Sequence, residues 1–248
     1  MKKIIKILVL VLFVILVIIA CKKEKSDNPT TGKTTAVFNP GLTYGTMTDQ
    51  DGNVYKTITI GTQTWMAENL RTIKYRDGTP IPNVTDNTTW TNLTTDAYCN
   101  YNNTTSADTI AIYGRLYNWY AATNSHNIAP IGWHVPTEAE WTTLIYYLGG
   151  YSVAGGKMKE TGTTHWKTPN TGATNESGFT ALPSGVRSDW RTTPIGKFVN
   201  MGYHTYYWGT TPINPNVDLL PCVFYSDATV GLGGFYKIDG WAVRLMKD

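Results

Sequence analysis

Charge is scarce in this chain, and the two signs nearly cancel. Only 16% of the 248 residues are charged, and 21 basic residues stand against 18 acidic ones. Lys2, Lys3 and Lys6 lie in an N-terminal segment that we expect to be removed, and without these three the chain carries 18 residues of each sign. A phosphate backbone needs a basic stripe on which to dock. The composition therefore excludes nucleic acid as a partner.

Cysteine and histidine are also few. The three cysteines and four histidines show no spacing typical of a zinc or copper site, and no histidine stands at a triad-like spacing from a serine or a carboxylate. The Gly-x-Ser-x-Gly turn of a nucleophilic serine is absent. A carboxylate pair for glycoside hydrolysis stays an open alternative, since geometry and not spacing defines such pairs. We therefore expect no catalytic residue, no metal and no cofactor.

The chain has one long apolar run, at its N-terminus. Three lysines precede an unbroken apolar stretch from Ile7 to Ile19, and Cys21 follows Ala20. This pattern predicts a lipoprotein signal peptide over residues 1–20 and lipid attachment at Cys21. The run is shorter than the roughly 20 residues of a membrane-spanning helix, although an uncleaved helix stays the alternative. We expect the protein to be anchored by its lipid to the outer membrane of a Gram-negative bacterium, facing the periplasm or the cell surface.

Residues 21–36 are polar and predict a flexible tether, because they have almost no apolar side chain to bury. Residues 37–248 contain no second linker and no internal repeat, and their length suffices for one domain with a core. Asp51-Gly52 predicts a hairpin turn between strands at 46–48 and 54–60. Turn chemistry explains Asp49 and Asp51 better than a calcium loop does, since the rest of such a loop is absent.

The segment from Gly132 to Gly150 predicts a capped amphipathic helix. Thr137 is suited to cap the helix, and Glu140 stands where its side chain reaches back to the cap amide. Apolar residues then recur at helical spacing, beginning with Trp141, which predicts one buried face. Gly149 and Gly150 end the helix. We expect His134, just before it, to be a structural residue.

Further elements follow from local pattern. We expect helices at 114–123 and 152–160, a polar loop at 77–95, and strands at 63–70, 179–182, 206–208, 223–225, 234–238 and 241–246.

Several short sequence motifs of the chain resemble motifs of a known family. Gly-Trp-His-Val-Pro-Thr at 132–137, Trp-Met-Ala-Glu-Asn-Leu at 65–70 and Gly-Arg-Leu-Tyr-Asn-Trp at 114–119 are similar to words of the Fibrobacter succinogenes major paralogous domain, found in secreted bacterial lipoproteins. The first word is also similar to a segment of the formylglycine-generating enzymes, whose fold is C-type-lectin-like. The resemblance implies an α+β, C-type-lectin-like domain with two main helices, short antiparallel sheets and long loops. It brings no activity with it.

The resemblance leaves the state of the two remaining cysteines open. Cys99 matches the family, but the strand that holds its usual partner candidate has Leu245 instead. Either Cys222 is a relocated partner in a disulfide with Cys99, or both are buried free thiols. The formylglycine-generating enzymes have a paired, metal-binding cysteine arrangement near the C-terminus. This chain lacks that arrangement, so we expect no enzyme.

Aromatic residues give the strongest indication of function. Six tryptophans fall in predicted elements or family words and are expected in the core, namely Trp65, Trp119, Trp133, Trp141, Trp208 and Trp241. In a C-type-lectin-like fold, residues 184–215 would line the loop face where ligands bind. The expected ligand-binding residues there are Trp190, Arg191, Tyr203, His204 and Tyr206, with Arg187, Asp189, Asn200 and Tyr207 nearby. The alternative is that these rings pack the loops. The calcium-binding words of sugar-binding lectins are absent.

The predicted function is a non-catalytic, lipid-anchored binding module at the cell surface, for a glycan or a protein ligand. The alternative is a structural or adhesive subunit of a surface assembly with no small ligand.

Overall fold

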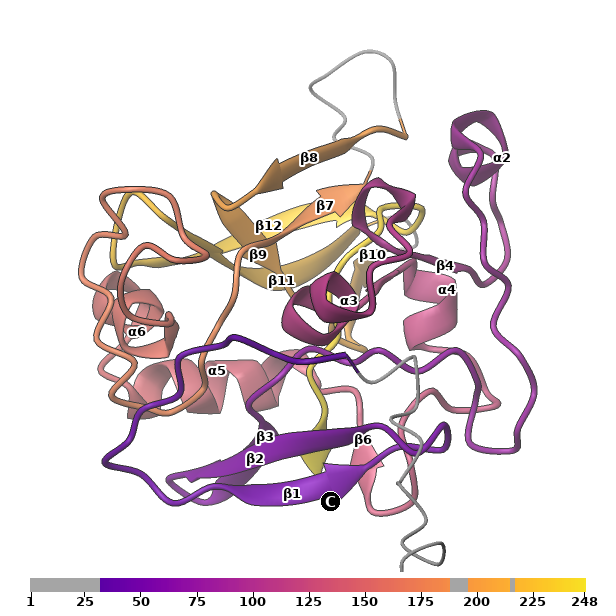
Figure 1. The fold of residues 1–248 in the computed structure, drawn as a ribbon. Helices are drawn as coiled ribbons and strands as arrows, with labels where there is room; N and C mark the ends of the chain where they lie inside the picture. The colour runs from indigo at the N-terminus through magenta and orange to yellow at the C-terminus, as the bar shows by residue number, and fades with distance from the viewer. Residues whose placement is uncertain (1–31, 188–195, 215–216) are drawn as a thin grey trace, which may run out of the picture.

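The computed structural model describes residues 32–187, 196–214 and 217–248, and Figure 1 shows a mixed fold of helices and small antiparallel sheets. The predicted signal peptide and Cys21 lie outside these residues. The largest sheet has the order β1-β2-β3-β13-β6. Its strands are β1 (Gly45–Thr48), β2 (Val54–Ile60), β3 (Gln63–Met66), β6 (Trp133–His134) and β13 (Met246–Lys247). The first and last strands of the described chain therefore share one sheet.

A second sheet is built from late segments. β11 (Val217–Phe224) pairs with β12 (Val230–Tyr236), with β10 (Pro212–Asn214) and with β9 (His204–Tyr206), always antiparallel. Two smaller ladders join β4 (Tyr98–Cys99) to β5 (Leu116–Tyr117) and β7 (Ser184–Arg187) to β8 (Phe198–Met201). The late strands expected at 206–208, 223–225 and 234–238 overlap β9, β11 and β12, so the expectation of short antiparallel pairs is confirmed there.

The helices are α2 (Asn87–Thr91), α3 (Ala107–Tyr113), α4 (Trp119–Ala122), α5 (Glu138–Tyr147) and α6 (Tyr151–Met158), with a 3₁₀ turn at Tyr101–Asn103. Two expectations were wrong. The expected helix at 114–123 is only the four-residue α4, because β5 occupies residues 116–117 as the partner of β4. The expected polar loop at 77–95 contains α2, which buries Trp90 completely.

The capped helix is confirmed as α5. The Thr137 hydroxyl accepts from the Glu140 amide at 3.3 Å, and the Glu140 carboxylate accepts from the Thr137 amide at 2.8 Å. Trp141 is buried and stacks on Tyr207, with ring centroids 5.5 Å apart. Gly149 and Gly150 both have positive φ and separate α5 from α6, the predicted third helix.

A buried arginine connects the two segments expected as strands at 179–182 and 241–246. Arg244 is fully buried and donates to the carbonyl oxygens of Met66, Phe179 and Thr180 and to Oδ1 of Asn69. The expected strand at 179–182 is absent apart from a single bridge of Ala181 to Lys159. In place of the expected strand at 241–246, Trp241 and Ala242 form isolated bridges, and β13 begins only at Met246.

The hairpin turn at residues 49–53 also forms as predicted. Asp49 accepts from the amides of Asp51 and Asn53, and Gly52 has a φ of 81°. Asp51 accepts from the Ile73 amide. Turn hydrogen bonds therefore account for Asp49, whereas Asp51 is held by residues 72–74. Within the described residues no helix is long and apolar enough to cross a bilayer.

Candidate functional site

The structure describes only part of the predicted ligand face. Trp190, Arg191 and Asp189 lie outside the described residues. Tyr203 is 40% exposed, and its ring meets the edge of the Tyr225 ring at 5.0 Å. His204 is half-buried, with its ring 4.8 Å from that of Phe224. Of the described candidates, only Tyr203 presents a large exposed surface.

Two neighbours in that segment are core residues. Tyr206 is only 4% exposed, and its ring lies 5.0 Å from that of Trp241. Arg187 is fully buried, donates to the Val84 and Thr85 carbonyl oxygens, and lies over the Trp90 ring. The prediction that Tyr206 meets a ligand is wrong for this structure, because β9 turns its side chain into the main hydrophobic cluster. Tyr207 is likewise buried, against Trp141.

Both remaining cysteines are buried free thiols. Cys99 packs in a small cluster with Trp90 and Leu116, whereas Cys222 belongs to the main cluster. Burial raises the pKa of each thiol to about 12. Of the two alternatives, the structure holds free thiols and not a disulfide between Cys99 and Cys222.

Three histidines contact carboxylates. His126 lies 2.5 Å from Asp77 at the surface. His134 lies 2.7 Å from Asp248 and 3.0 Å from Glu140. His165 lies 2.8 Å from the buried Glu160, and its other ring nitrogen is 2.9 Å from the Thr35 hydroxyl. The spacing argument missed these pairs. His134 is held from both sides, as expected of a structural residue. In the described part of the chain, no cluster of three His, Cys, Asp or Glu side chains suits a metal ion.

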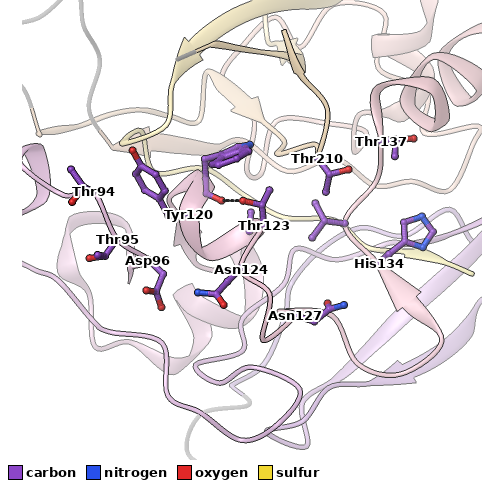
Figure 2. Close-up of a pocket in the computed structure, with 13 residues that line it drawn as sticks. Thr94, Thr95, Asp96, Tyr120, Thr123, Asn124, Asn127, His134, Thr137 and Thr210 are labelled. Carbon is purple, nitrogen blue, oxygen red and sulfur yellow. Dashed lines mark hydrogen bonds between the residues drawn. The ribbon is translucent and has the colours of Figure 1, made fainter. Parts of the chain in front are cut away.

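The first site candidate is a groove of about 810 Å³ beside α4. It is open along its length and runs from residues 94–96, past α4 and the following loop, to the start of α5 (Figure 2). Its thirteen lining residues are Thr94, Thr95, Asp96, Trp119, Tyr120, Ala122, Thr123, Asn124, Asn127, His134, Val135, Thr137 and Thr210.

Asn118 holds two sides of this groove together, namely residues 95–97 and α4. The Asn118 side-chain oxygen caps α4 by accepting from the Ala121 amide at 3.0 Å, and it accepts from the Ala97 amide at the same distance. Its amide nitrogen donates to the Thr95 carbonyl at 2.8 Å. Because Asn118 is fully buried, residues 95–97 are fixed beside α4. A rigid wall of this kind can hold a ligand at little entropic cost.

Two aromatic residues line one end of the groove. Trp119 and Tyr120 are half-buried, and their ring centroids are 6.0 Å apart. The Lys237 ammonium lies 3.8 Å from the centre of the Trp119 ring. In Figure 2, Tyr120 lies near Thr94, Thr95 and Asp96, while His134 and Thr137 are at the far end. Trp119 is thus not the core residue that was expected. Both rings line the groove, and the adjacent Trp119-Tyr120 pair was visible in the sequence.

Many polar groups in the groove have no partner in the protein. In the described part of the chain, no hydrogen bond uses the hydroxyls of Thr94, Thr95, Tyr120 and Thr210 or the side-chain NH₂ of Asn127. Asp96 accepts from the Tyr75 hydroxyl through Oδ2 at 2.7 Å, and its other oxygen is unused. In contrast, Thr123 donates to the Trp119 carbonyl, the bond dashed in Figure 2.

The groove has little positive charge. Its lining contains no Lys or Arg, one carboxylate at Asp96, and His134. Burial lowers the pKa of His134, but hydrogen bonds to Asp248 and Glu140 outweigh it and leave the pKa raised. The imidazolium is thereby paired with two carboxylates. It is therefore not free to attract an anionic ligand.

Comparison with known proteins places the chain in a family. The model of the Fibrobacter succinogenes major domain matches residues 58–227, and the chain belongs to that family. The matched span contains every residue that lines the groove. No curated protein and no solved structure matches the chain.

Proposed function

We propose that the protein is a non-catalytic binding module, anchored by lipid at Cys21 to the outer membrane, and that its ligand occupies the groove beside α4. The observation that carries this proposal is the set of uncommitted polar groups along a groove with two aromatic residues at one end. Its volume of about 810 Å³ falls within the range of ligand sites in proteins.

A binding role suits the groove better than catalysis. His134, the histidine of the lining, has one ring nitrogen beside Asp248 and the other beside Glu140. Asp96 is hydrogen-bonded to Tyr75, and Glu140 caps α5. General base catalysis needs a base within reach of the proton that it removes. Each of these titratable groups has a structural partner instead.

We assign the fold to the C-type-lectin-like class. The resemblance of the Gly132–Thr137 word supports this assignment. So does the arrangement of two adjacent helices, α5 and α6, before a set of late antiparallel strands with long connections.

The test is a binding screen of the full-length protein in detergent, against glycans and against surface proteins of the same cell. Tyr120→Ala removes a ring from the groove and should abolish binding. The matched control is Tyr147→Ala, since Tyr147 is 65% exposed on α5 and does not line the groove. Thermal unfolding of both variants should match that of the parent. A ligand bound equally by both variants would place the site elsewhere.

A structural subunit is the second candidate. Tyr146 and Tyr147 are each 65% exposed at the end of α5, and Ile131 is 85% exposed before β6. Exposed apolar side chains of this kind can join subunits. Replacing both tyrosines with Ser should then disperse a surface assembly, which crosslinking on intact cells would detect, while Tyr120→Ala would leave the assembly unchanged.

A further inference from the structure

We infer that the groove binds an uncharged glycan chain, an inference that rests on the proposed binding function. The groove contains three kinds of feature that such a ligand needs. These are uncommitted hydroxyl and amide groups, aromatic rings at one end, and a lining without lysine or arginine.

Charge excludes acidic ligands first. A uronate or sulfate group in the groove would lie near Asp96, with no Lys or Arg in the lining to pair with it. The Lys237 ammonium lies over the Trp119 ring, and His134 is paired with Asp248 and Glu140. Taking an anion out of water without a partner is costly. A neutral ligand avoids that cost.

The uncommitted groups match hydroxyls. A sugar hydroxyl both donates and accepts, and so do the free hydroxyls of Thr94, Thr95 and Tyr120. Asp96 supplies an acceptor. Burial and the nearby Asp96 raise the pKa of Tyr75, so Tyr75 keeps its proton and donates to Oδ2 of Asp96. The free oxygen of Asp96 then accepts from a ligand hydroxyl.

The rings give the apolar part of the contact. The C–H groups on one face of a pyranose form an apolar surface, and an aromatic ring offers a flat face of matching size. Tyr120 lies at the same end of the groove as Asp96 and the two threonines (Figure 2). A sugar stacked on Tyr120 would therefore place its hydroxyls beside Asp96. At the far end, the free groups of Asn127 and Thr210 contact a second sugar along the chain.

The experiment measures binding of defined oligosaccharides to the full-length protein in detergent, by calorimetry. The probes are neutral oligomers of glucan, mannan and xylan, each compared with oligogalacturonate and with a sulfated oligomer of the same length. We expect at least one neutral series to bind about tenfold or more tightly than both acidic probes, a difference of about 1.4 kcal/mol. Affinity should rise with chain length until the groove is filled.

Three variants test the contacts. Tyr120→Ala should weaken neutral binding at least tenfold, whereas Tyr120→Phe, which keeps the ring, should lose less. Asp96→Asn removes the negative charge and should narrow the ratio between neutral and acidic probes. Asp108→Asn is its matched control, since Asp108 is an acidic residue of α3 outside the groove. It should leave that ratio unchanged, and the melting temperature of each variant verifies the fold.

The outcomes separate the inference from the proposed function. If acidic probes bind as tightly as neutral ones, and Tyr120→Ala abolishes both, the inference is wrong and the groove is still the binding site. The same holds if only a protein ligand binds in a Tyr120-dependent way. If no glycan and no surface protein binds in a way that Tyr120→Ala affects, the proposed function fails as well.

Discussion

The two buried cysteines show how strongly a residue's surroundings control its chemistry. Cys99 and Cys222 have their pKa values raised to about 12 by burial. A thiol reacts as its thiolate, so both should be inert in the folded protein at pH 8. In Gly231, an added Cβ would lie 2.6 Å from the Cys222 sulfur, which shows how closely the sheet packs on this thiol.

The burial of both thiols predicts how many of them react with a chromogenic disulfide reagent. In the lipid-modified protein at pH 8, no thiol should react while the chain is folded, and two should react in denaturant. A count of zero in denaturant, restored to two by prior reduction, would show that Cys99 and Cys222 form a disulfide and that the free-thiol arrangement is wrong.

His134 links the C-terminal residue Asp248 to Glu140 at the start of α5 through charge. Its pKa is raised above the ordinary 6.5 because the hydrogen bonds to Asp248 and Glu140 outweigh burial. A raised folded-state pKa means that the folded chain binds the proton more tightly than the unfolded chain. The contribution to stability is therefore fully present below pH 6.5 and is lost as the pH rises through the folded-state pKa.

Urea unfolding between pH 5 and pH 8 should detect this dependence. His134→Gln should flatten the decline in stability with rising pH, because Gln cannot bind the proton. Asp248→Asn should flatten it partly, since Glu140 still faces the ring. An unchanged slope in His134→Gln would show that another group causes the decline.

At the level of elements, α5 was the most predictable part of the fold. A helix that has its own cap, spacing and glycine stop needs little help from distant residues. The four-residue α4 could not be predicted in the same way. Its cap, Asn118, also binds residues 95 and 97, and this contact exists only after folding. The groove that depends on α4 was therefore missed, although its aromatic pair was visible in the sequence.

The stability of α5 gives a graded prediction. Thr137→Ala should cost about 1 kcal/mol through loss of the cap. Trp141→Ala should cost on the order of 3–5 kcal/mol, since it removes a buried ring that packs on Trp65 and Tyr207. Chemical denaturation measures both. Thr143→Ala, an exposed site in the same helix, is the control and should change stability little. Equal effects for Thr137 and Thr143 would contradict a role for the cap.

For the whole molecule, composition and sequence motifs predicted the family and the mixed α+β class correctly. They did not predict the position of the candidate site. The chain belongs to the family whose words it contains, and its small antiparallel sheets were expected. Within 184–215, ligand-binding residues were predicted from their residue type and from the analogy to a C-type-lectin-like fold. Burial depends on the pairing of β9 with β11, which local pattern does not specify, so Tyr206 was misplaced in the surface set.

The proposed lipid anchor concerns the whole chain, and labelling can test it. Cells grown with labelled palmitate should incorporate it into the parent protein. Cys21→Ala should leave an unlabelled, unprocessed precursor in the inner membrane. Release of a shortened, soluble product from the Cys21→Ala variant would instead point to an ordinary signal peptide and contradict the anchor.

The strand order of the largest sheet has a consequence for export. β13, at residues 246–247, lies between β3, at residues 63–66, and β6 (Figure 1). Until those late residues are available, β3 and β6 have no strand to join them, and the sheet stays divided. Pairings between residues so distant in the chain form slowly. If the chain is exported as proposed, this late closure favours its passage through a membrane before the sheet is complete.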